Sequence, residues 1–232
     1  MPETPWPQGL QVAIVDYGMG NLFSVKHACE AVGLKAALVS SAQDILSAVG
    51  VILPGVGAFG DAMEALARLD LVSVLLDIAA SEKPLVGICL GMQLLMTGSH
   101  EFGWHRGLGI IEGEVVRLEP SVSCGDTRLK VPQVGWNRIY EISNGSWKDS
   151  FLEGLKDGEF MYFVHSFYVR PVDSSLLLST TRFGDIEFCS SLRRGNVFAC
   201  QFHPERSGLH GLCIYRNLAA RIAQSTAEAH HA

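Results

Sequence analysis

The first hundred residues alternate short apolar runs with segments of helical periodicity. The run at residues 12–15 is followed by Asp-Tyr-Gly, which is typical of a buried strand that enters a loop. Apolar residues recur at helical spacing over 22–32 and 61–80, and Asn21 and Gly33 are placed to begin and end the first of these helices. Further strands are predicted at residues 36–39, 51–53 and 85–89, and a further helix at residues 91–96. Apolar strands joined by helices predict a parallel sheet that helices cover on both faces.

After residue 108 the pattern becomes rich in β-structure. Strands are predicted at residues 110–118, 134–140, 161–169, 176–181, 186–190 and 197–202, and a last helix at residues 209–223. Neither a repeat nor a low-complexity linker separates this half from the first. We therefore expect one α/β domain over residues 11–225, with a central mixed, mostly parallel sheet, a proline-rich leader at 1–10 and a tail at 226–232.

Composition narrows the class of protein. The 232 residues include 18 Lys and Arg against 24 Asp and Glu, a net charge of −6, which argues against partners such as nucleic acid or anionic membrane. The longest stretch free of polar side chains, 48–60, falls well short of the ~20 apolar residues of a membrane span, and residues 1–7 do not resemble a signal peptide. The six cysteines are too sparse in a chain of this length for a disulfide scaffold, and none forms a C-x-x-C pair, which argues against a zinc ribbon. We expect a cytoplasmic protein.

A candidate nucleophile lies between a predicted strand and the helix that follows it. The segment Gly87-Ile88-Cys89-Leu90-Gly91 is the cysteine counterpart of the G-x-S-x-G turn, in which glycines leave room for a sharply turned nucleophile. The start of a helix also favours the thiolate of Cys89, because the helix dipole stabilises negative charge there. A structural cysteine between two packing glycines is the alternative.

A candidate base lies near the end of the chain, in Gln201-Phe202-His203-Pro204-Glu205. In an extended segment His203 and Glu205 share a face because they are two residues apart. A carboxylate beside an imidazole fixes its tautomer and stabilises the imidazolium ion. A loop histidine and a surface ion pair between Glu205 and Arg206 are the alternative. Combined with Cys89, the segment completes a Cys-His-Glu triad.

A glycine-rich loop, Pro54 to Gly60, follows another predicted strand. It lacks the Lys and Ser/Thr of a phosphate-binding loop, so its pattern does not indicate nucleotide binding. Because parallel sheets bind ligands at the C-terminal ends of their strands, the loop is suited to form an oxyanion hole with the N–H of Leu90. A plain turn is the alternative.

Together these motifs resemble those of the class I, triad-type glutamine amidotransferases. The specific pair is Gly87–Gln93 with His203–Glu205, and the supporting segments are residues 16–22, 54–59, 132–137 and 162–166. The resemblance spans residues 11–222 and implies a single class I glutamine amidotransferase domain that needs no metal or organic cofactor. Three positions depart from the residues common in the family, with Phe23 in place of Arg, Gln133 in place of His and Phe167 in place of Tyr. These departures leave the triad intact and bear on the partner interface.

The resemblance also implies roles for individual residues. Cys89 attacks the side-chain amide of glutamine, His203 relays the proton, and Glu205 orients His203. The implied oxyanion residues are Leu90, Gly55, Val56 and Gly57, the implied substrate contacts are Gln93, His165, Ser166 and Phe167, and the implied partner-facing residues are Asn21, Trp136, Asn137 and Tyr162. A solvated helix position for Gln93 and a core position for Trp136 are the alternatives.

The branch of the family that the chain resembles implies a partner. In that branch a glutaminase subunit forms a glutamyl thioester, hydrolyses it to glutamate, and passes the ammonia to a TIM-barrel cyclase subunit. The cyclase makes imidazole glycerol phosphate and the aminoimidazole carboxamide ribonucleotide in histidine biosynthesis. The resemblance thus implies a heterodimer with ammonia channelling and an isolated subunit of low activity. We expect a peptide flip in the Pro54–Gly57 loop, eased by the glycines beside Val56, to switch the oxyanion hole.

Three alternatives to this function remain distinguishable. A sister amidotransferase would keep the triad, but many carry P-G-G in the oxyanion loop and lack Gly135-Trp136-Asn137. A cysteine peptidase or γ-glutamyl hydrolase would release its product without passing on ammonia. A silent regulatory subunit would form no thioester on Cys89. The intact His203-Pro204-Glu205 segment argues against the last two.

Overall fold

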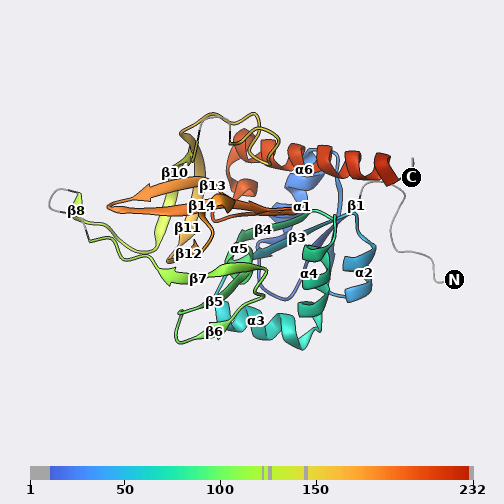
Figure 1. Ribbon diagram of the computed structural model, residues 1–232, viewed down its shortest axis with the longest axis horizontal. Helices are drawn as coiled ribbons and strands as arrows, with labels where there is room; N and C mark the ends of the chain where they lie inside the picture. The colour runs from blue at the N-terminus through green and yellow to red at the C-terminus, as the bar shows by residue number, and fades with distance from the viewer. Residues whose placement is uncertain (1–10, 122, 125–126, 144–145, 230–232) are drawn as a thin grey trace.

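A central sheet of mixed direction runs through the protein (Figure 1). The computed structural model describes residues 11–121, 123–124, 127–143 and 146–229, and within them this sheet has nine strands. In spatial order these are β11 (Glu159–His165), β10 (Gln133–Glu141), β13 (Leu177–Phe183), β14 (Ile186–Arg194), β15 (Val197–Cys200), β4 (Leu85–Cys89), β3 (Gly50–Gly55), β1 (Gln11–Val15) and β2 (Lys35–Val39). Neighbours from β15 to β2 pair in parallel, and those from β11 to β15 pair antiparallel. The predicted mixed sheet is confirmed, with an antiparallel part larger than expected.

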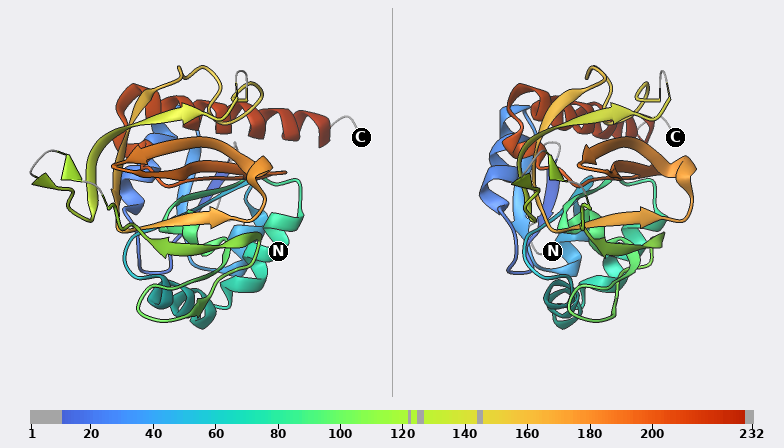
Figure 2. Two further views of the ribbon diagram at one scale, coloured as in Figure 1. Left: turned by 60° about the vertical axis from the view of Figure 1, so that its left-hand side comes forward. Right: turned by 90° about the vertical axis from the view of Figure 1, so that its left-hand side faces the viewer.

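A smaller sheet packs beside the central one. Among the described residues it has four strands, in the order β12 (Phe167–Pro171), β7 (Ile111–Arg117), β5 (Met96–Ser99) and β6 (His105–Arg106). Val115 of β7 and Val169 of β12 are buried in the same core as the helices beside them. A short pair of strands, β8 (Ser123–Cys124) and β9 (Thr127–Arg128), projects from the body of the protein (Figure 2).

Helices cover both faces of the parallel part of the sheet. On one face lie α1 (Leu22–Ala31) and α6 (Gly208–Ala229), and on the other lie α2 (Ala42–Ser47), α3 (Phe59–Arg68), α4 (Leu71–Ala80) and α5 (Leu90–Leu94). Two short 3₁₀ turns, η1 (Ser174–Leu176) and η2 (Pro204–Arg206), complete the described elements. The alternation of strand residues produces two cores, because Ala13 and Val15 face α2–α5 whereas Val12 and Ile14 face α1 and α6.

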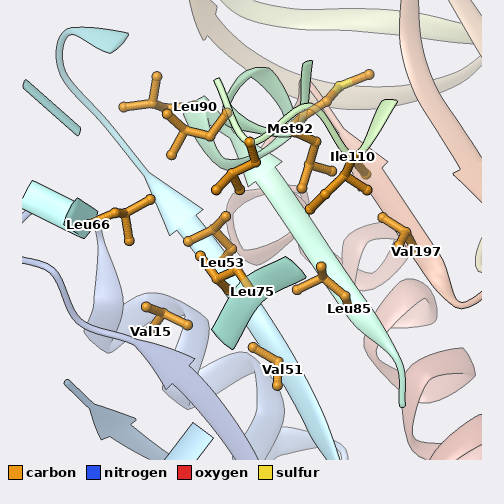
Figure 3. Close-up of a cluster of buried hydrophobic side chains, with 14 of the residues drawn as sticks. Val15, Val51, Leu53, Leu66, Leu75, Leu85, Leu90, Met92, Ile110 and Val197 are labelled. Atoms are coloured by element: carbon orange, nitrogen blue, oxygen red, sulfur yellow. The ribbon is translucent and has the colours of Figure 1, made fainter. Parts of the chain in front are cut away.

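Aliphatic side chains fill the core on the α2–α5 face (Figure 3). Leu53 of β3, Leu66 of α3 and Leu75 of α4 are fully buried there. Truncating such a leucine to alanine costs about 2–5 kcal/mol. This packing fixes the C-terminal ends of β3 and β4, where several predicted site residues lie.

Residues 61–80 form two helices rather than the single one predicted. α3 ends at Arg68 and α4 begins at Leu71, and between them Asp70 has a left-handed backbone (φ 55°). Because neither Gly nor Pro marks this point, the hydrophobic period gives no sign of the break. The turn allows residues of both helices to reach the same core.

Other boundaries also differ from the predictions. The predicted helix at 91–96 ends early, and β5 begins at Met96. The predicted strand at 161–169 divides at Ser166 into β11 and β12, which belong to different sheets. The Ser166 carbonyl accepts a hydrogen bond from the Leu118 N–H (2.8 Å). α2, capped by Ser41, was not predicted, and the Asn21 side chain precedes α1 without capping it.

The two ends of the chain bear on the predicted domain limits. α6 continues to Ala229, past its predicted end at residue 223. The predicted leader at 1–10 and residues 230–232 of the predicted tail lie outside the described residues. No helix in the described part of the chain is long and apolar enough to cross a membrane.

Candidate active site

Cys89 lies at the sharp turn between β4 and α5. Its backbone is left-handed, with φ 55° and ψ −109°, which is a strained conformation for a residue with a side chain. A Cβ on Gly91 would lie 1.8 Å from the Leu53 carbonyl oxygen, and a Cβ on Gly87 would lie 3.1 Å from the Gly91 backbone. The two glycines therefore allow α5 to start against β3 and β4, as the motif predicts.

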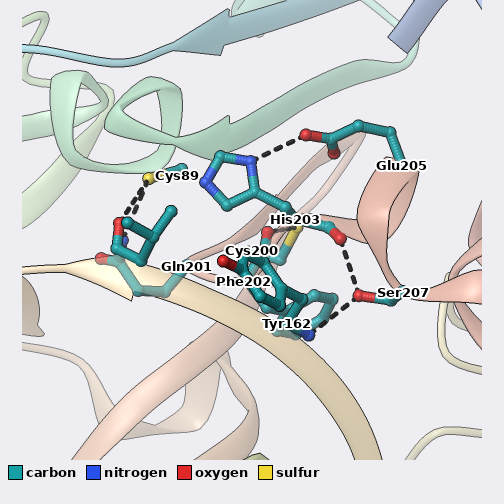
Figure 4. Close-up of polar contacts among 9 residues, drawn as sticks. Cys89, Tyr162, Cys200, Gln201, Phe202, His203, Glu205 and Ser207 are labelled. Atoms are coloured by element: carbon teal, nitrogen blue, oxygen red, sulfur yellow. Dashed lines mark hydrogen bonds and ion pairs between the residues drawn. The ribbon is translucent and has the colours of Figure 1, made fainter. Parts of the chain in front are cut away.

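His203 and Glu205 meet beside Cys89 (Figure 4). The Nδ1 atom of His203 is 2.8 Å from a Glu205 carboxylate oxygen, and both side chains are almost fully buried. The ring lies between the carboxylate and the sulfur of Cys89. Its buried Nε2 has no hydrogen-bond partner among the described residues. The structure thus brings the three predicted triad residues together.

Electrostatics favour the charged form of His203. Burial of the ring opposes protonation, but the neighbouring Cys89 sulfur and the Glu205 carboxylate outweigh it and raise the pKa of His203 to about 10. In contrast, burial raises the pKa of Cys29 to about 12, and it raises the pKa of the Cys200 thiol as well. Burial thus disfavours the thiolates of Cys29 and Cys200, whereas the ring next to Cys89 is held in its charged form.

Hydrogen bonds hold the backbone of the His203 segment in place. The Ser207 hydroxyl donates to the His203 carbonyl (2.7 Å) and accepts from the Tyr162 N–H (3.0 Å). The His203 N–H in turn donates to the Tyr162 carbonyl (2.9 Å). The end of β15 is thus tied to β11, and the imidazole has a fixed position relative to Cys89.

A cavity of about 300 Å³ opens in front of Cys89. Its lining includes Val56, Gly57, Leu90, Gln93, His165, Ser166 and Phe167, which were all predicted to contribute to the site. It also includes Glu101, which no motif or spacing in the sequence marks; one Glu101 carboxylate oxygen accepts the Phe59 N–H (2.7 Å) at the start of α3. A larger hollow of about 500 Å³, lined in part by Arg193 and Arg221, contains none of the predicted site residues.

Two glutamine side chains form a chain of hydrogen bonds that leads from the cavity wall to the sulfur of Cys89. The amide nitrogen of Gln93 lies 3.0 Å from both the Phe167 carbonyl oxygen and the side-chain oxygen of Gln201. The amide nitrogen of Gln201 lies 3.6 Å from the Cys89 sulfur (Figure 4). Gln201 has no role in the sequence-based predictions, although it lies only two residues before His203. The extended segment predicted through Glu205 is not found, because Pro204–Arg206 form the 3₁₀ turn η2.

His165 contributes to the site without a free ring nitrogen. Its Nδ1 is 2.9 Å from the Phe167 carbonyl oxygen, and its Nε2 is 3.1 Å from the side-chain amide of Gln133. Burial lowers the pKa of His165 to about 4, so the ring is neutral near pH 7. The side chain therefore fixes the backbone of the residues that line the cavity.

The predicted oxyanion loop begins within β3, whose last residue is Gly55, and continues through Val56 and Gly57 at the mouth of the cavity. Its first residue is tightly packed, because a Cβ on Gly55 would lie 2.3 Å from the Tyr17 hydroxyl, which donates to the Pro54 carbonyl (2.9 Å). Its last residue, Gly57, has a positive φ of 108°. Val56 between them is partly exposed and lines the cavity. Leu90, which begins α5, lies directly against the loop, because a Cβ on Gly55 would also be 3.0 Å from the Leu90 Cβ.

The family is shown by comparison with known proteins. The sequence model described as "Glutamine amidotransferase class-I" matches residues 13–219. The chain belongs to this family. This amidotransferase is 45% identical to the imidazole glycerol phosphate synthase subunit HisH of Aquifex aeolicus, over 94% of this chain and 100% of that protein. It is 42% identical to the subunit of the same name from Geobacter sulfurreducens, over 89% of this chain and 97% of that protein. The family resemblance drawn from the motifs is confirmed.

Solved structures show the same fold. A protein described as a glutamine amidotransferase matches with a TM-score of 0.68 at 19% identity, over 93% of this chain and 100% of that chain. PurLQS from Thermotoga maritima matches with a TM-score of 0.64 at 21% identity, over 94% of this chain and 100% of that chain. At these identities the likeness supports the predicted fold class alone.

The residues predicted to face a partner occupy different surroundings in the amidotransferase. Trp136 and Tyr162 are opposite each other on β10 and β11, with ring centres 6.0 Å apart. Asn137 points to the other face of β10, where its amide donates to the Arg182 carbonyl (2.8 Å). Asn21 is exposed just before α1, which contacts η2 of the triad segment. We call the exposed apolar side chains of the hairpin, Val134, Trp136, Tyr140 and Phe160, the β10–β11 patch.

The described residues offer no evident metal site. In that part of the chain no three His, Cys, Asp or Glu side chains come together in a way that would hold a metal ion.

Proposed function

We propose that this amidotransferase is a glutaminase subunit that hydrolyses glutamine to glutamate and ammonia through a thioester on Cys89. The observation that carries the proposal is the imidazole of His203 between the sulfur of Cys89 and the carboxylate of Glu205. Nucleophile, base and orienting carboxylate in this order are the arrangement of acyl transfer through a covalent intermediate.

In the first half-reaction the Cys89 thiolate attacks the amide carbon of glutamine. The oxygen of the tetrahedral intermediate takes the negative charge and receives hydrogen bonds from backbone N–H groups at Leu90 and the Gly55–Gly57 loop. The intermediate collapses when the C–N bond breaks, the imidazolium of His203 gives its proton to the leaving nitrogen, and ammonia departs. The glutamyl thioester on Cys89 and a neutral His203 remain.

In the second half-reaction His203 acts as the base. It removes a proton from a water molecule, which attacks the thioester carbon, and the carbon–sulfur bond breaks to release glutamate. The thiolate returns, and His203 again holds the proton. The raised pKa of His203, about 10, favours this imidazolium–thiolate resting state.

The cavity has groups that match the two ends of glutamine. Gln93 donates both amide hydrogens, to Phe167 and Gln201, so the atom left to face the cavity is its oxygen. This acceptor is suited to the amide NH₂ of glutamine and unsuited to the carboxylate of glutamate. At the other end, the Glu101 carboxylate is suited to the substrate ammonium group, and the backbone of His165, Ser166 and Phe167 to its carboxylate.

The ammonia requires an acceptor, and we assign it to a TIM-barrel cyclase subunit. The full-length similarity to HisH subunits of imidazole glycerol phosphate synthase supports this partner. Its products would be imidazole glycerol phosphate and the aminoimidazole carboxamide ribonucleotide, as in histidine biosynthesis. We place the cyclase against the β10–β11 patch, whose exposed aromatic residues are typical of protein interfaces, and against Asn21.

Acid-quench trapping of the thioester tests the proposed chemistry. Radiolabelled glutamine should leave label on the wild-type chain and on Cys213→Ala, which removes a partly exposed thiol on α6. The same treatment should leave none on Cys89→Ala. Label that persists on a folded Cys89→Ala variant would refute the proposal.

A further inference from the structure

We propose that Gln201 is a fourth side chain of the reaction centre, which donates an amide hydrogen to the sulfur of Cys89 and so favours the thiolate. The inference deepens the proposed function, because it rests on Cys89 as the nucleophile. The proposed hydrogen bond does not depend on which substrate Cys89 attacks.

Gln201 lies directly beside the nucleophile. The residue follows β15 without a gap, is fully buried, and has its amide nitrogen 3.6 Å from the Cys89 sulfur. Figure 4 shows its side chain on one side of the sulfur and the ring of His203 on another. The sulfur therefore has two polar side chains beside it, from residues two apart in one segment.

Neighbouring groups fix the orientation of the Gln201 amide. The Phe167 carbonyl oxygen can only accept a hydrogen bond, so the Gln93 atom that lies 3.0 Å from it is the amide nitrogen. That nitrogen gives its second hydrogen to Gln201, which must present its oxygen, also at 3.0 Å. The NH₂ of Gln201 is then left facing Cys89. A backbone carbonyl thus fixes the direction of the whole chain of hydrogen bonds, from Phe167 through Gln93 to the nucleophile.

The neutral ring of His165 strengthens this arrangement. Its Nδ1 donates to the same Phe167 carbonyl (2.9 Å), so the carbonyl accepts two hydrogen bonds and has a fixed orientation. His165, Phe167 and Gln93 all line the cavity in front of Cys89. The groups that orient Gln201 are therefore part of the site itself.

The consequence for the sulfur depends on its charge. As a thiol, Cys89 is placed to donate to the Val164 carbonyl oxygen, 3.9 Å away. As a thiolate it can only accept, and Gln201 supplies a hydrogen for that state. A thiol sulfur accepts a hydrogen bond weakly and a thiolate accepts it strongly, so the Gln201 amide favours the charged form, the more so in a buried site. Gln201 thereby shares with His203 the stabilisation of the nucleophile.

Two variants of Gln201 separate this role from packing. Gln201→Met keeps the size of the side chain but removes the donor, and Gln201→Glu keeps the shape but places a carboxylate near the sulfur. The rate of Cys89 alkylation by iodoacetamide, followed on its own peptide by mass spectrometry, is measured from pH 5 to pH 10 for the full-length chain. We expect the pH of half-maximal rate to rise by about one unit in Gln201→Met and by more in Gln201→Glu, with little change in the rate at high pH.

A structural role predicts a different result. If Gln201 only fills space, the folded Gln201→Met variant keeps the wild-type pH midpoint, or loses rate at every pH alike, and either outcome overturns the proposal; Gln201→Glu is the control that shows a shift of the midpoint can be measured. Should Gln201→Met fail to fold, Gln201→Leu, which also lacks the donor, takes its place. Because alkylation does not involve glutamine, the test remains valid even if the chain acts on another substrate.

Discussion

Protonation of His165 should destabilise the protein in mild acid. The side chain is buried, and its pKa falls from 6.5 to about 4, chiefly because burial disfavours the charged ring. The unfolded chain binds a proton below pH 6.5 that the folded chain excludes until about pH 4. His165 therefore contributes stability above pH 6.5, and this contribution is lost as the pH falls towards 4.

The two pKa values set the size of the effect. Between pH 7 and pH 5 the free energy of unfolding should fall by about 2 kcal/mol through His165 alone. Other groups titrate in the same range, so the measurement compares the wild type with His165→Gln, which cannot titrate. Urea unfolding of both chains at the two pH values gives the difference directly.

The comparison has a clear outcome in either direction. We expect the pH-dependent loss of stability to be smaller by about 2 kcal/mol in His165→Gln than in the wild type. The baseline stability of the variant does not matter, because only the change with pH is compared. Equal losses in the two chains would show that His165 takes up its proton in the folded state near the ordinary pH, and would refute the account of a neutral, buried ring.

Three further substitutions test other parts of the site. Glu205→Gln should lower glutamate release by at least about 100-fold without unfolding the chain, because it removes the carboxylate that orients the imidazole; activity near the wild-type level would contradict that role. Gly91→Ala should destabilise the chain by about 3 kcal/mol in urea unfolding, since its Cβ would lie 1.8 Å from a backbone oxygen. Gly33→Ala, which meets nothing within 4 Å and loses only a positive φ, is the control and should cost about 1 kcal/mol; equal losses would exclude the steric argument. Trp136→Ala should weaken binding to the cyclase subunit by at least about 10-fold in calorimetry while leaving glutamate release by the isolated chain unchanged, and unchanged affinity would place the interface elsewhere.

The parts of the site that follow from local chemistry could be predicted from the sequence. The glycines around Cys89 have a steric reason that any G-x-C-x-G turn shares. His203 and Glu205 meet as their separation by two residues suggests, although Pro204–Arg206 form a 3₁₀ turn and not the extended segment that was predicted. Both features are properties of a few consecutive residues. The structure shows each of them in the predicted place.

The parts that depend on tertiary packing could not be predicted in this way. Glu101 reaches the cavity because the loop before β6 lies against the start of α3, and Gln201 acquires a partner only when β15 pairs beside β4. The same reason explains the strand predicted at 161–169, where sequence periodicity is continuous but the chain passes from one sheet to the other at Ser166. The break at Asp70 likewise reflects the packing of two helices on one core.

The most direct test of the central claim is glutamate release from glutamine by this chain, alone and with the cyclase subunit of imidazole glycerol phosphate synthase carrying its ribonucleotide. Glutamate is measured by an enzyme-coupled assay, and Cys89→Ala is the blank in both conditions. Low release by the isolated chain with strong stimulation in the complex is the predicted result. Equal release with and without the cyclase would contradict the proposed coupling, and no release above the Cys89→Ala blank in either condition would contradict the glutaminase itself.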